Sequence, residues 1–291
     1  MRRILLTGAD GQLGWELRRT LAPLGEVLAC TRSDIDLRDE RRLRERIREI
    51  GPDAIVNAAA YTAVDRAESE EPIAMAVNAS APRILAEEAQ RCGASLVHYS
   101  TDYVFDGTKV GAYCEDDQPN PINAYGRTKL AGERAVAEVG GRYLIFRTSW
   151  VYASRGANFV RTMLRLAKER SELRVVDDQL GAPTWARLIA EATGIAFVQA
   201  LSASASRSSL SGIYHLTCSG NTTWRAFAET IFANARLAQQ PTVVPISSSE
   251  YPTPARRPLN SVLSNEKARE TFGIALPAWQ LALQYCLEET T

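Results

Sequence analysis

A tyrosine and a lysine four positions apart, Tyr125 and Lys129, point most directly to chemistry. On a helix this spacing places both side chains on one face, roughly 6 Å apart along the axis. An ammonium beside a phenol lowers the pKa of the phenol, and the start of a helix acts in the same direction. Tyr125 is therefore a candidate proton donor. The alternative is an ordinary contact between an aliphatic chain and a ring.

A glycine-rich stretch near the N-terminus is the second candidate site. Gly8, Gly11 and Gly14 follow a short apolar run at residues 4–7 and precede an amphipathic run. The order strand, glycine turn, helix binds the pyrophosphate of a dinucleotide on backbone N–H groups. The spacing G-x-x-G-x-x-G differs from that of many dehydrogenases. Its position still favours a dinucleotide site, with Gln12 and Leu13 in the turn, over a purely structural turn.

The residues that follow the second expected strand, at residues 26–30, indicate whether the dinucleotide is NADPH or NADH. In such folds this position meets the adenosine ribose, where an arginine suits a 2′-phosphate and an acidic residue suits a 2′-hydroxyl. Arg32 therefore favours NADPH, although a surface arginine in a loop is nearly as good an interpretation. Asp36 and Leu37 are expected beside the adenine from their position alone.

Two further strands end in residues that suit a ligand. Ala58, Ala59 and Ala60 close the strand expected at residues 53–60, and their small side chains would let a flat cofactor approach the backbone. Packing against a helix would explain them equally. The strand at residues 96–101 delivers Thr101 and Asp102 to the carboxyl edge of the sheet, where doubly wound folds bind ligands.

The composition excludes several classes of partner and site. Lys plus Arg and Asp plus Glu both total 34, so net charge gives no reason to expect nucleic acid or an anionic membrane. Five cysteines without a C-x-x-C pair, and only two histidines, support neither a disulfide framework nor a zinc site. With no signal sequence and no membrane span in view, we expect a cytoplasmic protein.

Before residue 150 we expect five strands separated by four helices, the fifth strand at residues 142–147, and a further sheet strand at residues 212–217. This order predicts an α/β fold with a doubly wound parallel sheet of Rossmann type. The second half is less regular and predicts a smaller α/β substrate-binding domain. We assign residues 1–150 and about 185–217 to the dinucleotide-binding domain, and residues 151–184 and 218–291 to the substrate domain. We interpret His98 as a packing residue. Residues 61–71 are expected to form a polar loop, residues 104–123 a covering flap and residues 201–211 a mobile loop. Helices are expected at residues 73–92 and 224–237. Residues 245–258 are expected to be irregular and end in Arg256 and Arg257, which could clamp a diphosphate or form a solvated basic turn.

Taken together, the motifs resemble a family. The glycine turn, Asn57-Ala58-Ala59-Ala60, the run from Ser100 to Gly107 and Tyr125-x-x-x-Lys129 are similar to those of the extended short-chain dehydrogenase/reductases. More narrowly, a second set of motifs resembles the dTDP-4-dehydrorhamnose reductase family over nearly the whole chain. These motifs are Val64-Asp65-x-Ala67-Glu68, Arg147-Thr148-Ser149-Trp150-Val151-Tyr152, the turn at residues 179–184 and Arg257-Pro258-x-Asn260-Ser261.

The resemblance implies reduction of the C4 ketone of dTDP-4-dehydro-β-L-rhamnose to dTDP-L-rhamnose, the last step of dTDP-L-rhamnose biosynthesis, with NADPH or NADH as hydride source. Tyr125 would act as general acid, Lys129 would keep the phenol acidic and hold the nicotinamide ribose, and Thr101 would donate to the carbonyl oxygen. Candidates on the substrate side are Val64, Asp102, Trp150 and Arg257, and Asn78 corresponds to an asparagine that supports the lysine.

Two rival functions stay open. An epimerase or 4,6-dehydratase shares this fold, but a dehydratase typically has Asp-Glu after the threonine, whereas Asp102 is followed here by Tyr103. A non-catalytic dinucleotide-binding subunit would not need Thr101, Tyr125 and Lys129 together.

The resemblance also implies an assembly and a metal. Some members are homodimers bridged by Mg²⁺ through glutamates near the C-terminus. Glu288 and Glu289 stand there, but nothing in the sequence places them opposite a partner's carboxylates. We therefore expect a solvated acidic tail and assign no metal ligand.

Overall fold

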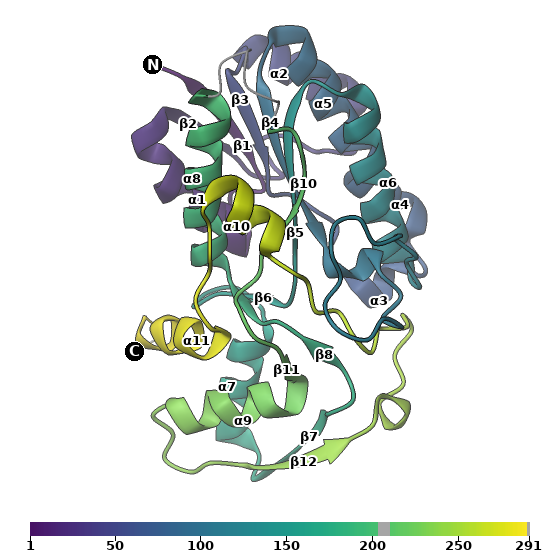
Figure 1. The fold of residues 1–291 in the computed structure, drawn as a ribbon, viewed down its shortest axis with the longest axis vertical. Coiled ribbons are helices and arrows are strands. Elements are labelled where there is room, and N and C mark those ends of the chain that lie inside the picture. The colour runs from purple at the N-terminus through teal and green to yellow at the C-terminus, as the bar shows by residue number, and fades with distance from the viewer. Residues whose placement is uncertain (203–209, 290–291) are drawn as a thin grey trace.

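A six-stranded parallel sheet forms the centre of the larger part of the molecule (Figure 1). The computed structural model describes residues 1–202 and 210–289. The strand order is β10-β5-β4-β3-β1-β2, and every neighbouring pair is parallel. The strands are β1 (Arg3–Thr7), β2 (Glu26–Cys30), β3 (Ala54–Asn57), β4 (Ser95–Thr101), β5 (Arg142–Thr148) and β10 (Gly212–His215). The expected α/β class with a doubly wound parallel sheet is confirmed.

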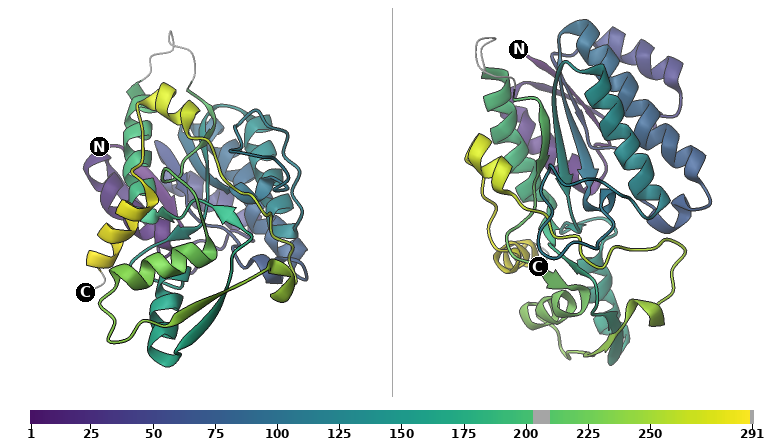
Figure 2. Two further views of the ribbon diagram at one scale, coloured as in Figure 1. Left: turned by 60° about the horizontal axis from the view of Figure 1, so that its bottom comes forward. Right: turned by 45° about the vertical axis from the view of Figure 1, so that its right-hand side comes forward.

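Helices cover both faces of this sheet (Figures 1 and 2). Side chains alternate between the faces of a strand, so Ile4 and Leu6 of β1 join the core on one side and Leu5 joins the core on the other. The first core is closed by α1 (Gln12–Leu21), α8 (Ala186–Ser202) and α10 (Glu266–Phe272). The second is closed by α2 (Glu40–Ile50), α5 (Ala81–Cys92) and α6 (Ala124–Val139).

A smaller lobe lies below the carboxyl edge of the sheet in the view of Figure 1. Its core joins aromatic and aliphatic side chains of three helices and a separate parallel strand pair. These elements are α7 (Phe159–Glu169), α9 (Trp224–Asn234), α11 (Trp279–Glu288), β7 (Glu172–Val176) and β12 (Thr242–Ile246). Short strands complete the lobe and its junction with the sheet: β6 (Val151–Tyr152), β8 (Leu180–Gly181), β9 (Thr184–Trp185) and β11 (Thr222–Thr223).

Several local expectations need correction. The polar loop expected at residues 61–71 contains the short helix α3 (Val64–Ala67). The single helix expected at 73–92 consists of α4 (Glu71–Met75), a π-helical turn (Ala76–Ser80) and α5. Part of the segment expected to be irregular forms β12, and α10 was not expected.

The stretch 201–211, expected to be a mobile loop, falls largely on residues 203–209, which lie outside the described residues. Among the residues described, no helix combines the length and the apolar character needed to cross a bilayer.

Candidate active site

The glycine turn between β1 and α1 is shaped by close backbone contacts. A Cβ on Gly8, whose φ is +69°, would lie 2.6 Å from the backbone N of Ala59, and one on Gly14 would lie 2.0 Å from the carbonyl O of Gly8. Gly11 precedes α1 as its N-cap and supplies no capping side chain. The first N–H groups of α1 therefore have no side-chain acceptor, which is the arrangement that binds a phosphate at a helix start.

The residues expected to meet the adenosine end of a dinucleotide follow β2. Arg32 is exposed, and Leu37 is buried in the core. Asp36 forms a bidentate ion pair with Arg38, in which Nε lies 3.0 and 3.1 Å from the two carboxylate oxygens. This pairing lowers the pKa of Asp36 to about 2, and Arg32 contributes to the lowering. Two arginines therefore lie near the place where the ribose is expected.

The candidate acid Tyr125 lies at the start of α6, where the helix meets the end of β4. Asn123 caps α6, and its side chain accepts a hydrogen bond from the N–H of Gly126 at 2.8 Å. A Cβ on Gly126 would lie only 2.1 Å from the carbonyl O of Tyr103, so the absence of a side chain lets α6 approach the turn after β4. The Tyr103 and Tyr125 rings pack edge to face with centroids 5.8 Å apart.

Burial governs the acidity of Tyr125. It raises the pKa of this phenol to about 12, while the neighbouring Thr101 hydroxyl offsets part of the rise. The expectation that Lys129 lowers the pKa of Tyr125 was wrong, because burial raises this pKa and the ammonium donates to the carbonyl O of Tyr99 instead. The phenol is therefore protonated at neutral pH, which is the form that a proton donor requires.

Lys129 is buried and is held by groups of the sheet. Its Nζ donates to the carbonyl O of Tyr99 at 2.6 Å and lies 3.4 Å from His98 Nε2. Burial lowers the pKa of Lys129 to about 8, against a smaller opposite effect of Glu133. Burial also lowers the pKa of His98 well below its ordinary value.

His98 belongs to a buried polar chain that crosses three strands below the site. The Asn57 side chain lies 3.0 Å from His98 Nδ1 and accepts a hydrogen bond from the Thr7 hydroxyl at 2.7 Å. No pattern in the sequence indicates this network, because an isolated histidine within an apolar strand looks the same as a packing residue.

Thr101 and Asp102 are both buried at the end of β4. The Thr101 hydroxyl donates to Asp102 Oδ1 at 2.9 Å and accepts from the N–H of Tyr103 at 3.1 Å. Burial raises the pKa of Asp102 to about 6, while neighbouring hydroxyls, including that of Ser261, oppose the rise. This carboxyl therefore titrates closer to neutral pH than an exposed aspartate would.

Arg257 is fixed by an ion pair across a long sequence separation. Its Nη1 and Nη2 lie 3.0 and 2.9 Å from the two carboxylate oxygens of Asp65, and Nη1 also donates to the Thr253 hydroxyl and the Ala255 carbonyl. The first residue of α3, Val64, precedes this aspartate and is partly exposed. Arg257 is thus oriented by Asp65 rather than free to clamp a diphosphate with all its donors.

Trp150 lies at the junction between the sheet and the smaller lobe with an unusual backbone conformation. Its φ is 46°, which is uncommon for a residue other than glycine. Its ring stacks on Trp224 with centroids 3.5 Å apart and planes 6° apart, and Gly181 lies directly against it. Trp224 was expected only to begin a helix. The sequence pattern of an aromatic residue at the start of an amphipathic helix does not indicate that it stacks on a tryptophan 74 positions earlier.

Asn78 lies in the π-helical turn and is fully buried. Its side chain pairs with the backbone N and O of Tyr61 at 2.8 and 3.1 Å and donates to the Thr128 hydroxyl at 3.1 Å. These contacts connect the segment before α3 to the turn of α6 that carries Lys129.

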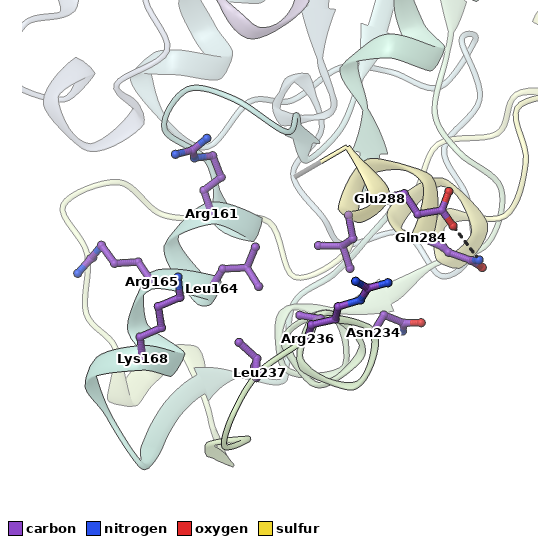
Figure 3. A pocket seen from close by; sticks show the side chains of 11 residues that line it. Arg161, Leu164, Arg165, Lys168, Asn234, Arg236, Leu237, Gln284 and Glu288 are labelled. Atoms are coloured by element: carbon purple, nitrogen blue, oxygen red, sulfur yellow. Dashed lines mark hydrogen bonds between the residues drawn. The ribbon is translucent and has the colours of Figure 1, made fainter. Parts of the chain in front are cut away.

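A basic surface pocket lies apart from this site, in the smaller lobe (Figure 3). Arg161, Arg165 and Lys168 of α7 line one side, and Arg236 and Gln284 line another. The lining includes none of the candidate catalytic residues Thr101, Tyr125 and Lys129. The pocket is therefore separate from the candidate active site.

The chain matches a family model over its whole length. The model described as the RmlD substrate binding domain matches residues 1–291. A dTDP-4-dehydrorhamnose reductase of Burkholderia thailandensis is 52% identical, with 99% of this chain and 98% of the relative covered.

Solved structures agree with this sequence relationship. A crystal structure of a dTDP-4-dehydrorhamnose reductase from Clostridium acetobutylicum superimposes with a TM-score of 0.92 at 37% identity, covering 99% of each chain. The enzyme of the same name from Bacillus anthracis, in complex with NADP, superimposes with a TM-score of 0.91 at 37% identity, again covering 99% of each chain.

Proposed function

Because the chain belongs to the RmlD substrate-binding domain family, we propose that it catalyses the NADPH-dependent reduction of the C4 ketone of dTDP-4-dehydro-β-L-rhamnose to dTDP-L-rhamnose. This is the last step of dTDP-L-rhamnose biosynthesis. The observation that carries the proposal is the protonated Tyr125 beside Thr101, in a chain that is 52% identical to a reductase of this name over 99% of its length.

The residues of the glycine turn fit a dinucleotide. Gly8, Gly11 and Gly14 with Gln12 and Leu13 would hold the pyrophosphate against the uncapped start of α1. The backbone of Ala58, Ala59 and Ala60 would line the same side, because Ala59 already packs on Gly8. When bound, NADPH supplies the hydride that reduces the ketone.

Arg32 supports NADPH as the cofactor. An exposed guanidinium at this position suits a 2′-phosphate, and Asp36 is occupied by Arg38 rather than free to accept a ribose hydroxyl. The carboxylate of Asp36 does not repel a phosphate strongly while it is paired. NADH remains a usable cofactor, because the remaining contacts with the dinucleotide come from the glycine turn.

Tyr125 Oη delivers the proton to the oxygen formed from the ketone. The high pKa of Tyr125 keeps the proton on the phenol before reaction. Thr101 lies beside the phenol, and its hydroxyl can turn from Asp102 to donate a hydrogen bond to the same oxygen as negative charge develops. Lys129 would bind the nicotinamide ribose hydroxyls from its position on the same helical face as Tyr125.

Residues from both parts of the molecule would bind the sugar nucleotide. Trp150 offers a flat apolar surface held in place by Trp224. Arg257, oriented by Asp65, carries positive charge for the diphosphate, and Val64 and Asp102 would contact the sugar nucleotide.

The rival functions are less well supported. A dehydratase acid and base pair is not formed here, because Tyr103 follows Asp102 and packs against Tyr125. A non-catalytic subunit would not need a buried, oriented Lys129 beside Thr101 and Tyr125.

We also propose a cytoplasmic location and leave open a homodimer. In the described part of the chain, Cys30, Cys92, Cys114 and Cys218 are free thiols, which suits a reducing compartment.

The direct test is oxidation of NADPH by the purified protein with dTDP-4-dehydro-β-L-rhamnose, followed by absorbance at 340 nm and by identification of dTDP-L-rhamnose. The expected result is substrate-dependent loss of absorbance, faster with NADPH than with NADH. An unchanged absorbance with verified substrate would refute the proposal. Tightly bound NAD that survives purification and interconverts a sugar epimer would instead favour the epimerase.

A further inference from the structure

The carboxylates near the C-terminus already have partners within the chain. The family resemblance implies that glutamates of this region bind Mg²⁺. Glu288 accepts a hydrogen bond from Gln284 at 3.2 Å, and Glu289 forms an ion pair with Arg187. Among the described residues, histidine, cysteine, aspartate and glutamate side chains form no group of three or more suited to a metal.

Arg187 lies between two carboxylates from opposite ends of the chain. Its Nε is 3.2 Å from Glu16 Oε2, and its Nη1 pairs with Glu289 Oε1. The Glu16 side chain is buried, with 3% of its surface exposed, and Arg19 supplies a second cation to the same oxygen. Arg187 itself is only 25% exposed and lies 5.1 Å from the centre of the Trp185 ring.

This donor set does not fit Mg²⁺. Magnesium requires oxygen ligands in a nearly ideal octahedron at about 2.1 Å. The space between Glu16 and Glu289 is instead occupied by a guanidinium, whose planar donors match carboxylates directly. A metal ion could bind these two carboxylates only after Arg187 had been displaced, and Arg187 would then lose both partners in a half-buried position.

We propose that Arg187 provides, from within the chain, the positive charge that joins Glu16 and Glu289, and that this region therefore needs no divalent cation. The ion pairs link α1, which follows the glycine turn, to the start of α8 and the end of α11. The C-terminal helix is thus attached to the dinucleotide-binding part by an arginine. The inference is independent of the proposed reaction.

The test compares melting temperatures of the full chain in MgCl₂ and in EDTA. The parent protein is expected to melt at the same temperature in both. Arg187→Glu places a third carboxylate beside Glu16 and Glu289, so in EDTA it is expected to melt roughly 5–10 °C lower, since it breaks a partly buried ion pair. Mg²⁺ is then expected to restore part of this loss in a saturable manner.

Arg165→Glu is the matched control, because Arg165 pairs with Glu169 on an exposed face of α7. It is expected to shift the melting temperature little and to show no response to Mg²⁺. A saturable rise in the parent's melting temperature with Mg²⁺, or stoichiometric magnesium in the dialysed parent by elemental analysis, would overturn the proposal. So would an Arg187→Glu variant that behaves like Arg165→Glu.

If Arg187→Glu does not fold, Arg187→Gln provides a second measurement. Glutamine removes the cation without adding a charge, so a lower melting temperature than the parent's in EDTA is expected. A melting temperature equal to the parent's would show that the guanidinium does not hold these helices together.

Discussion

At the scale of single residues, burial decides the state of the two central groups. Tyr125 keeps its proton because burial raises the pKa of its phenol to about 12. Lys129 is held by the carbonyl of Tyr99, and burial lowers the pKa of its ammonium to about 8. A buried lysine of this kind stabilises the fold less than an apolar residue would, and we interpret it as present for function.

Replacing Tyr125 by phenylalanine removes the proposed acid while keeping the ring. Tyr125→Phe is expected to lower kcat roughly 10²- to 10⁴-fold, the usual contribution of general acid catalysis, with little change in the Kd for NADPH. Stopped-flow turnover and fluorescence titration of NADPH measure the two quantities. Tyr285→Phe, at an exposed tyrosine of α11, is the control and should leave both unchanged. Equal rates for Tyr125→Phe and the parent would remove Tyr125 from the mechanism.

The depressed pKa of Lys129 predicts a pH-dependent stability difference. Between about pH 8 and its ordinary value of 10.5, Lys129 binds more proton in the unfolded than in the folded chain, so stability contributed by this group rises with pH across that window. Lys129→Met, which lacks the buried charge, is expected to be roughly 1 to 3 kcal/mol more stable than the parent below pH 8.

Urea unfolding of Lys129→Met and the parent at several pH values measures this difference. The advantage of the variant should shrink as the pH rises from about 8 towards 10.5. A difference that stays constant with pH would show that Lys129 keeps an ordinary pKa in the folded protein.

At the scale of elements, the approach of α6 to the turn after β4 brings Tyr125 to Thr101. Gly126 permits this approach, because any Cβ at this position would lie 2.1 Å from the carbonyl O of Tyr103. The cap formed by Asn123 fixes where the helix begins and therefore which residue occupies its first turn. The site thus depends on a contact between two backbones as well as on its chemical groups.

A methyl group at Gly126 tests this dependence. Its Cβ would lie 2.1 Å from the Tyr103 carbonyl O, so Gly126→Ala must move α6 away from the turn. We expect a loss of about 1–3 kcal/mol in stability and a fall of more than roughly tenfold in kcat, measured by urea unfolding and by turnover.

The control for this substitution is Gly194→Ala in α8, where the one close contact of the added methyl group among the described residues is the Thr20 side-chain methyl at 2.8 Å. Alanine also favours a helix by about 1 kcal/mol relative to glycine. Gly194→Ala should therefore keep its turnover. If Gly126→Ala shows full turnover, the close approach of the two backbones is not needed for catalysis.

At the scale of the whole molecule, segments far apart in the sequence form the site and hold its parts together. Arg257 reaches Asp65 across 192 positions, and Arg187 joins Glu16 to Glu289. α10 returns to the core of the large sheet between segments that belong to the smaller lobe. Both lobes are therefore built from several separate segments of the chain.

The sequence by itself determined the class of fold and the positions of the principal strands and helices. Apolar runs, glycine turns and helix breaks are local signals, and the five strands of the first half and β10 lie where these signals placed them, with small shifts at their ends. Short or weakly apolar elements were missed. They make contacts with distant residues: Asp65 of α3 pairs with Arg257, α10 packs into the core of the large sheet, and β12 pairs with β7.

For the candidate site, too, the sequence determined some features and the tertiary structure decided others. Motif spacing named Thr101, Tyr125 and Lys129, because strand ends and helix starts in this fold meet at one edge of the sheet. Only the tertiary structure decided that Lys129 turns to Tyr99 and His98, that Trp224 supports Trp150 and that Arg187 pairs with two distant glutamates. Burial and charge pairing depend on which residues surround a group in space, and a linear sequence does not contain that information.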